Sequence, residues 1–349
     1  KRKIMKITKI LVALSFLFAV STANAGELTV TGSMEATYTS EVDKTTGNPL
    51  GMDRELTFTG STELDNGITV SVMQDTSDNL GYGNSKITFG NVGGLVDIYV
   101  GSDGSEVDAI DDITPTAYEE ANAMSGTYQD VGNLAGQMGI GIKGTVPVLG
   151  TVSAQYVPKT DSTKNADNAA SGNANALVGS GVEVAIKTSL ADLPVVGSYL
   201  GDLALTTGYA EQETAKITNT SDRREATAAL TGSFGNFKFG YQKDFVDAGQ
   251  TAALTDAVFY KIEQIGLAYA INDALSISYS QEKYERIDKT MTNVTTNAET
   301  TVEAEADYIQ VAYNIGGATL GLALVDTDNS DYVDTKEEKK TVFSIGRSE

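Results

Sequence analysis

Residues 27–39 read E-L-T-V-T-G-S-M-E-A-T-Y-T and alternate strictly between two kinds of side chain. Apolar, aromatic and small residues such as Leu28, Val30 and Met34 take the even positions, and Thr, Ser and Glu take the odd ones. Side chains of a β-strand point alternately to opposite faces, so this period of two predicts a strand with one apolar and one polar face. Such a strand fits either a soluble sandwich or a membrane barrel.

The same alternation returns along the chain, for example at residues 68–73 and 275–279, and predicts sixteen strands. Short connections with turn residues, such as L-D-N-G at 64–67, alternate with long polar ones. The long connections lie near residues 40–53, 76–85, 102–136, 158–180, 211–222, 245–256, 284–302 and 326–339. Residues 190–202 are an exception, because they lie on the short-turn side but form a long turn. An even strand number with all long loops at one end predicts an all-β transmembrane antiparallel barrel.

The N-terminus carries the features of a secretory signal peptide. Five Lys or Arg residues within residues 1–9 precede an apolar run at 10–20, which A-N-A at 23–25 follows. We expect cleavage after Ala25, which leaves residues 26–349 as the barrel domain. The removed segment holds five cations and no carboxylate, so the net charge changes from −22 to −27. A charge this negative argues against nucleic acid as a partner.

The chain contains no His and no Cys. Their absence excludes Ser-His and Cys-His nucleophilic sites, disulfides and thiolate metal centres. No other catalytic constellation is evident, so we do not expect an enzyme. A barrel of sixteen strands is too wide for side chains to fill and encloses an aqueous channel.

Residues 101–124 form a long acidic insert directly after the fifth predicted strand. The insert holds seven carboxylates and no Lys or Arg: Asp103, Glu106, Asp108, Asp111, Asp112, Glu119 and Glu120. Carboxylates crowded into a narrow opening attract cations and repel anions. We therefore predict that this insert, as residues 102–124, folds into the lumen and favours the passage of cations.

Charged residues on the polar faces of the predicted strands are candidates for the lumen. They are Glu55, Glu63, Lys86, Asp97, Lys143, Glu183, Lys187, Lys238 and Asp244. Five of them are predicted to form the pore wall near the insert: Glu55, Lys86, Asp97, Lys143 and Lys187.

The chain resembles the general porins of Gram-negative bacteria over essentially its whole mature length. The resemblance rests on E-L-T-V-T-G at 27–32, L-D-N-G at 64–67 and K-I-T-F-G-N-V-G-G-L-V-D-I-Y-V-G at 86–101. It implies that the acidic insert is the third long loop, which narrows the pore of porins. It also implies a homotrimer in the outer membrane and passive diffusion of small hydrophilic solutes.

Two features depart from the family's pattern. Porins usually carry a cluster of Arg or Lys on the wall that faces the loop, but here Glu55 is predicted to point inward and the wall cations are few. The sequence also ends S-I-G-R-S-E at 344–349, where barrels of this kind usually end in an aromatic residue.

Three alternatives stay open at this point. A substrate-selective channel would share the fold, and so would a structural or adhesive outer-membrane barrel that conducts nothing. The third alternative is a calcium site in the insert, because Asp103, Glu106 and Asp108 offer the hard oxygen ligands that Ca²⁺ prefers. These residues lack EF-hand spacing, and such a site would be compatible with a pore.

Overall fold

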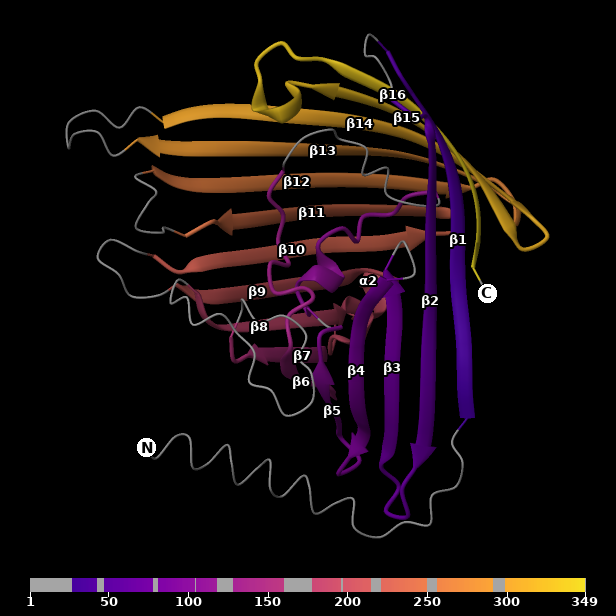
Figure 1. Ribbon diagram of the computed structural model, residues 1–349, viewed down its shortest axis with the longest axis vertical. Coiled ribbons are helices and arrows are strands. Elements are labelled where there is room, and N and C mark those ends of the chain that lie inside the picture. The colour runs from indigo at the N-terminus through magenta and orange to yellow at the C-terminus, as the bar shows by residue number, and fades with distance from the viewer. Residues whose placement is uncertain are drawn as a thin grey trace.

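The computed structural model describes residues 27–42, 47–77, 81–103, 105–117, 128–159, 178–195, 197–214, 221–249, 256–290 and 299–348. These residues form one closed antiparallel barrel, in which each strand pairs with its neighbours in the chain and β1 pairs with β16 (Figure 1). The strands are β1 (Glu27–Glu41), β2 (Leu50–Glu63), β3 (Thr69–Ser77), β4 (Gly81–Val92), β5 (Val96–Gly101), β6 (Gly139–Val146), β7 (Gly150–Val157), β8 (Val178–Ser189), β9 (Ala204–Thr214), β10 (Arg223–Phe234), β11 (Phe237–Asp247), β12 (Asp256–Ala270), β13 (Leu275–Thr290), β14 (Glu299–Ile315), β15 (Ala318–Asp328) and β16 (Glu338–Ser348). The predicted sixteen-stranded barrel is thereby confirmed.

Among the residues that the structure describes, helical structure is confined to short segments between strands. These are η2 (Asp108–Ile110), η3 (Leu190–Asp192), α2 (Gly197–Leu200) and η4 (Ser330–Tyr332). Within the described ranges, no helix has both the length and the apolar character needed to cross a membrane. The predicted signal peptide, residues 1–25, lies outside the described residues.

The alternation of each strand sorts its side chains between the lipid and the lumen. On β8, Val182 and Val184 are 46% and 40% exposed on the outer face, whereas Glu183 between them is 1% exposed. Apolar side chains on the outside of a closed barrel can face hydrocarbon, while hydrogen bonds between strands satisfy the backbone. Residues with the parity of Glu183 therefore face the lumen.

The connections at the short-turn end agree with the sequence, but one predicted long loop does not. Residues 76–85 were expected to form a loop, whereas β3 continues to Ser77 and β4 begins at Gly81. Thr76 pairs with Tyr82 after a β-bulge, which leaves three residues for the connection. Polar residues in this stretch are thus strand residues, and the second long loop of the prediction is wrong.

Several strands also extend further toward the long-loop end than the sequence indicates. Their added segments carry charges on the outer face, where oppositely charged side chains lie across neighbouring strands. The ion pairs are Arg224–Glu211 (3.4 Å), Lys243–Glu263 (3.4 Å), Lys261–Glu285 (3.1 Å) and Lys283–Glu305 (2.8 Å). Such charges are costly against hydrocarbon, so these segments lie beyond the apolar slab of the membrane.

Tyrosines mark the level at which the outer face changes from apolar to charged. Each donates its hydroxyl hydrogen to a carboxylate on the long-loop side of its ring. The pairs are Tyr209–Glu211 (3.0 Å), Tyr241–Glu263 (2.9 Å) and Tyr279–Asp307 (2.5 Å). Tyrosine favours membrane–water boundaries because its ring is apolar and its hydroxyl is polar.

The inner face of the same extended segments carries a large group of apolar side chains, beside buried carboxylates such as Glu225. Side chains from this wall and from two loops form one buried cluster: Val107, Val131, Leu134, Ala210, Val246, Ile262, Tyr284, Ala304, Ala306, Tyr308 and Val325. Tyr128 and Tyr332 pack against it with ring centroids 5.3 Å apart. The Tyr128 hydroxyl also accepts a hydrogen bond from the Asp331 amide at 2.9 Å. This cluster joins the third long loop to the last one.

Candidate functional site

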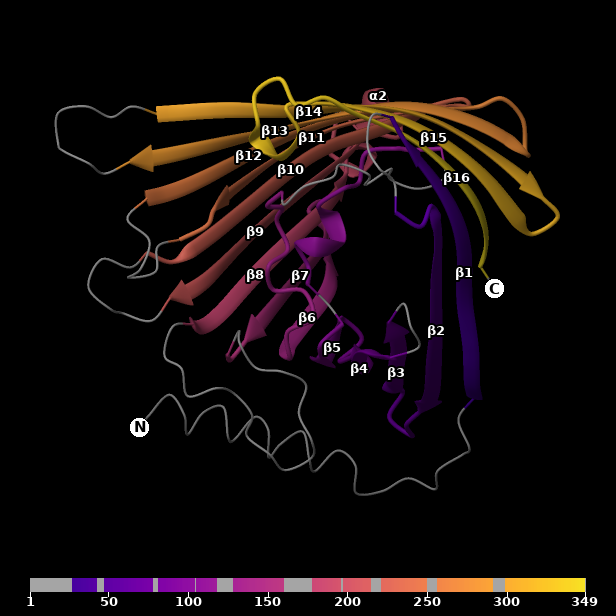
Figure 2. The ribbon, with the colours of Figure 1, turned by 45° about the horizontal axis from the view of Figure 1, so that its top comes forward.

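The segment after β5 runs along the inner face of the barrel (Figure 2). Its first anchor is Glu183 on β8, whose carboxylate accepts hydrogen bonds from the Ser105 hydroxyl and the Glu106 amide, both at 2.8 Å. The Val107 amide donates to the same carboxylate at 3.4 Å. Glu183 faces the lumen, so residues 105–107 of the acidic insert lie against the inner wall of the barrel.

Amide and hydroxyl side chains hold the next part of the loop. The Gln242 side chain on β11 accepts from the Ile113 amide at 3.1 Å and donates to the Ile110 carbonyl at 3.0 Å. Further on, the Ala117 amide donates to the Ser278 hydroxyl on β13 at 2.9 Å. Residues 105–117 thus cross the inner faces of several strands and are fixed to them.

Two inward-facing glycines let the loop lie close to the wall. A Cβ atom at Gly240 on β11 would lie 2.7 Å from Pro115 Cδ. One at Gly266 on β12 would lie 2.8 Å from the Pro115 carbonyl oxygen and 2.9 Å from its nitrogen. All three distances are too short for non-bonded atoms, so any larger residue must move the loop.

We expect Gly266→Val to lower the single-channel conductance, because the new side chain pushes Pro115 away from the wall and into the lumen. Backbone atoms would be in the way, so a side-chain rotation cannot relieve the clash. Conductance in planar bilayers measures the effect. Gly47→Val is the control, since a Cβ there meets nothing within 4 Å. An unchanged conductance for Gly266→Val would show that Pro115 does not limit the pore.

The returning arm of the loop is held by a second buried carboxylate. Glu225 on β10 accepts hydrogen bonds from the Gly132 amide at 2.7 Å and the Asn133 amide at 3.2 Å. The Tyr284 hydroxyl on β13 donates to Asp130 at 3.2 Å. Both arms are therefore fixed to lumen-facing side chains.

The seven predicted loop carboxylates have different surroundings. Asp103 pairs with Lys86 at 2.5 Å, and Glu106 accepts a hydrogen bond from the Tyr99 hydroxyl at 2.7 Å. Asp108 and Asp112 are exposed and Asp111 is half-buried. Glu119 and Glu120 lie outside the described residues.

Crowding and burial change the acidity of three loop carboxylates. Burial, and then the neighbouring Asp112, raise the pKa of both Asp108 and Asp111 above the usual range. Burial raises the pKa of Asp130 to about 6, against the opposing effect of the Tyr284 hydrogen bond. These three carboxylates of the third long loop therefore carry less negative charge near neutral pH than their number implies.

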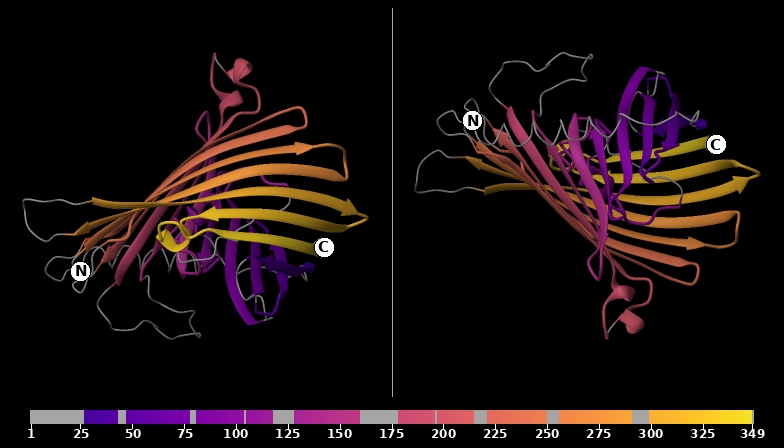
Figure 3. Two further views of the ribbon diagram at one scale, coloured as in Figure 1. Left: turned by 90° about the horizontal axis from the view of Figure 1, so that it is seen from above. Right: turned by 90° about the horizontal axis from the view of Figure 1, so that it is seen from below.

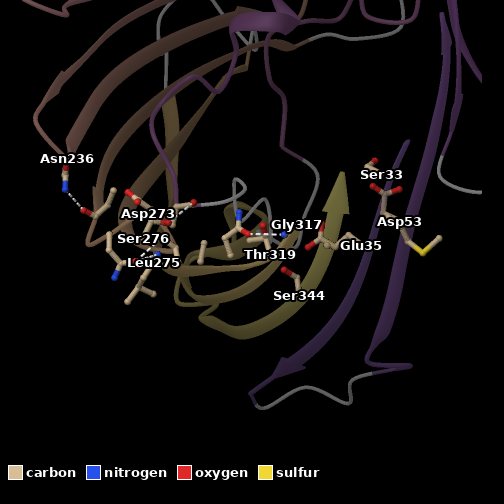
Figure 4. Close-up of a pocket in the computed structure, with 18 residues that line it drawn as sticks. Ser33, Glu35, Asp53, Asn236, Asp273, Leu275, Ser276, Gly317, Thr319 and Ser344 are labelled. Carbon is tan, nitrogen blue, oxygen red and sulfur yellow. Dashed lines mark hydrogen bonds between the residues drawn. The ribbon is translucent and has the colours of Figure 1, made fainter. Parts of the chain in front are cut away.

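A cavity of about 900 Å³ lies between the loop and the short-turn end of the barrel. Figure 4 shows Glu35 and Asp53 on one side of it, with Asp273 and Ser276 across from them. Ala117 of the loop also lines it, and none of the described lining residues is Lys or Arg. Glu35 and Asp53 are register partners on β1 and β2, so two carboxylates stand side by side.

Glu35 and Asp53 were not among the predicted site residues. The predicted loop at 40–53 includes Asp53, whereas β2 begins at Leu50. A strand extended to that point would have placed Asp53 on the same face as Glu55. Glu35 occupies an odd position in residues 27–39, so the alternation of this strand places it on the polar face that lines the lumen.

A profile of the family described as Gram-negative porin matches residues 11–331. The chain belongs to the Gram-negative porin family. Family and fold together place this porin in the outer membrane and indicate a channel. A comparison with curated protein sequences gave no match.

Solved structures resemble this porin in fold. OmpT of Vibrio cholerae is 10% identical with a TM-score of 0.66, and the match covers 95% of this chain and 100% of that one. A porin refined at 1.8 Å is 13% identical with a TM-score of 0.64, over 93% and 100% of the two chains. The outer-membrane channel DcaP of Acinetobacter baumannii is 9% identical with a TM-score of 0.63, over 95% and 99%.

The porin's predicted wall residues form two groups. Lys86 lies beside the loop, paired with Asp103, and Glu55 is exposed on β2. The others lie nearer the short-turn end: Asp97, Lys143 and Lys187. Asp97 accepts a hydrogen bond from the Asn91 amide in the β4–β5 turn at 2.9 Å.

Lys143 and Lys187 line a second cavity of about 270 Å³. Glu106, Ile110 and Ile113 of the loop also line it. The two lysines therefore lie under the loop, away from Glu35 and Asp53.

Asp103, Glu106 and Asp108, the candidate calcium ligands of the porin, do not converge on one point. Asp103 turns to Lys86 and Glu106 to Tyr99, while Asp108 lies at the start of η2. Across the described part of the chain, no group of three or more Asp or Glu side chains is arranged to hold a metal ion. The geometry therefore gives no support to calcium binding by these residues.

Proposed function

We propose that this porin lets small hydrophilic solutes diffuse passively and conducts cations in preference to anions. The 900 Å³ cavity carries the proposal, because Glu35, Asp53 and Asp273 line it without a Lys or Arg among its described residues. Fixed negative charge in a confined aqueous space raises the local cation concentration and excludes anions. Reversal potentials in a salt gradient across planar bilayers test this preference.

The constriction loop, residues 102–124, supplies the second half of the acidic passage in this proposal. Exposed Asp108 and Asp112 lie on the loop, and Glu55 lies on the wall of β2. The nearby cation Lys86 is neutralised by Asp103. The exposed carboxylates and the neutralised lysine support a passage with net negative charge. Glu119 and Glu120 are included in this proposal on the basis of the sequence alone.

We expect the double variant Asp108→Asn and Asp112→Asn to lower the cation-to-anion permeability ratio. Both side chains are exposed, so both act on ions in the passage. Asp111→Asn is the comparison and should have a smaller effect at neutral pH, because burial and Asp112 raise the pKa of Asp111 to about 9, so this side chain is already largely neutral. A ratio that is equal to wild type in the double variant would remove the loop from the selectivity mechanism.

Selectivity should also depend on pH. Asp130 has a pKa of about 6, so it is negative above this pH and neutral below it. As the pH falls from 7 to 5, the passage loses negative charge and the cation preference should weaken. Asp130→Asn should remove this part of the pH dependence, as measured by reversal potentials over that range. A wild-type curve that is flat from pH 7 to 5 would contradict the assignment.

We further propose a homotrimer. Support comes from the porin family and from a structural relative, the trimer form of Vibrio cholerae OmpT. Mass determination of the porin in detergent, with and without heating, tests this assembly. A mass of one chain before heating would contradict it.

A further inference from the structure

The turn between β8 and β9 is a compact unit that includes η3 and α2. Its ends are joined by a hydrogen bond from the Leu190 amide to the Leu203 carbonyl at 2.8 Å. Inside it, the Gly197 amide donates to the Leu193 carbonyl at 3.0 Å. Figure 3 shows this turn standing out from the rim, beyond the ends of β8 and β9. It lies at the short-turn end, which faces the periplasm in outer-membrane barrels.

The most exposed large apolar side chains of the described residues gather at this place. Val195 is 91% exposed, Tyr199 is 87% exposed, and Phe234 at the end of β10, beside the next turn, is 86% exposed. The two turns touch, because the Ser233 hydroxyl donates to Asp202 at 3.0 Å. A single patch of this kind on a protein surface marks a place where water is replaced by another apolar surface.

The patch continues the lipid-facing surface of the barrel. Phe234 has the same parity on β10 as Leu230, which is exposed on the outer face. Phe237 pairs with Phe234 across the β10–β11 hairpin and is exposed as well. The apolar outer face of β10 and β11 therefore reaches the hairpin that contacts the turn with Val195 and Tyr199.

The patch lies far from the β1–β16 pair that closes the barrel. β9 lies eight strands from β1 in the closed order, which is the opposite side of the cylinder. Described charges in residues 190–203 are limited to Asp192 and Asp202, so the turn offers no cation to an acidic partner. Tyr199 combines an apolar ring with a hydroxyl, as side chains at membrane–water boundaries do.

We infer that residues 190–195 and 197–203, together with Phe234, form an interfacial foot, which inserts Val195 and Tyr199 between the head groups and acyl chains of the periplasmic leaflet. The foot holds the β8–β11 side of the barrel at a fixed depth in the bilayer. Its partner is the phospholipid surface itself.

The chain has no Trp, so Tyr199→Trp introduces a single fluorescent reporter. In phospholipid vesicles, we expect blue-shifted emission and quenching by lipids brominated on the acyl chain, with little quenching by iodide. Leu230→Trp on the lipid-facing wall is the positive control. Asp65→Trp, in the β2–β3 turn at the same end, is the negative control and should show water-like emission.

Val195→Trp provides a second reporter, and the conductance of each variant verifies that the barrel has folded. Quenching of both variants by brominated lipid, comparable with that of Leu230→Trp, supports the foot. Emission that is water-like, open to iodide and insensitive to brominated lipid would overturn it. Protection from iodide that requires added periplasmic extract would also overturn it, because the partner would then be a protein.

Discussion

Replacing Glu35 and Asp53 together by lysine is expected to turn the cation preference into an anion preference. The two carboxylates are partners in the β1–β2 register and line the same cavity as Asp273. Their reversal changes the charge of these three lining positions from −3 to +1. Ions in the cavity are surrounded by protein and experience this change with little screening. The reversal potential in a salt gradient should therefore change sign.

A control with the same charge change separates the cavity from the whole protein. Asp334→Lys with Glu337→Lys alters two exposed carboxylates in the outer loop between η4 and β16. This variant should keep the cation preference. If the Glu35 and Asp53 double variant keeps it too, the cavity does not select ions.

Removing Glu183, the first anchor of the loop, should disturb the position of residues 105–117 more than any other single substitution. Glu183→Ala leaves the Ser105 hydroxyl and the Glu106 and Val107 amides without their shared acceptor. Each unpaired buried donor costs roughly 1–3 kcal/mol, so the position that residues 105–107 take against β8 loses much of its stabilisation. We expect the conductance to become larger and noisier, because residues 105–117 no longer keep one position across the lumen. Single-channel recordings measure both quantities.

Two further variants test whether the anchor acts through hydrogen bonds. Glu183→Gln keeps one acceptor oxygen and should restore a steadier current than Glu183→Ala. Glu213→Ala removes an exposed carboxylate that accepts a hydrogen bond from Ser180, and should leave the current unchanged. A quiet, wild-type current in Glu183→Ala would mean that Gln242 and the other contacts suffice.

Alternation in the sequence was enough to predict the barrel, the number of strands and the place of the acidic insert after β5. It failed where charged residues belong to strands. Lys261 and Glu263 lie near the start of the predicted strand, whereas β12 begins at Asp256. The predicted loop at 284–302 likewise includes strand residues, because β13 continues to Thr290. A charged strand looks like a loop in a sequence, because the partners that neutralise it lie on other strands.

The site was predictable only in part for a related reason. The seven loop acids were found by composition, and composition does not tell which of them are exposed. Asp103 is neutralised by Lys86, and the pKa of Asp111 is raised by burial and by Asp112. The anchors are long-range contacts: Glu106 and Glu183 are 77 residues apart in the chain. Only the closed barrel brings them together.

The reversed polarity of the extended strands has a consequence for what the cell presents to its surroundings. Beyond the tyrosine level, β9–β15 carry paired charges outside and an apolar cluster inside, which is the pattern of a water-soluble sheet. An antibody or a phage that approaches this side therefore meets ordered β-structure before it reaches the pore. Variation that evades such recognition is limited there, because outer charges such as Lys261 and Glu285 are paired across strands and the inner cluster includes Val131 and Leu134 of the returning arm of the third loop.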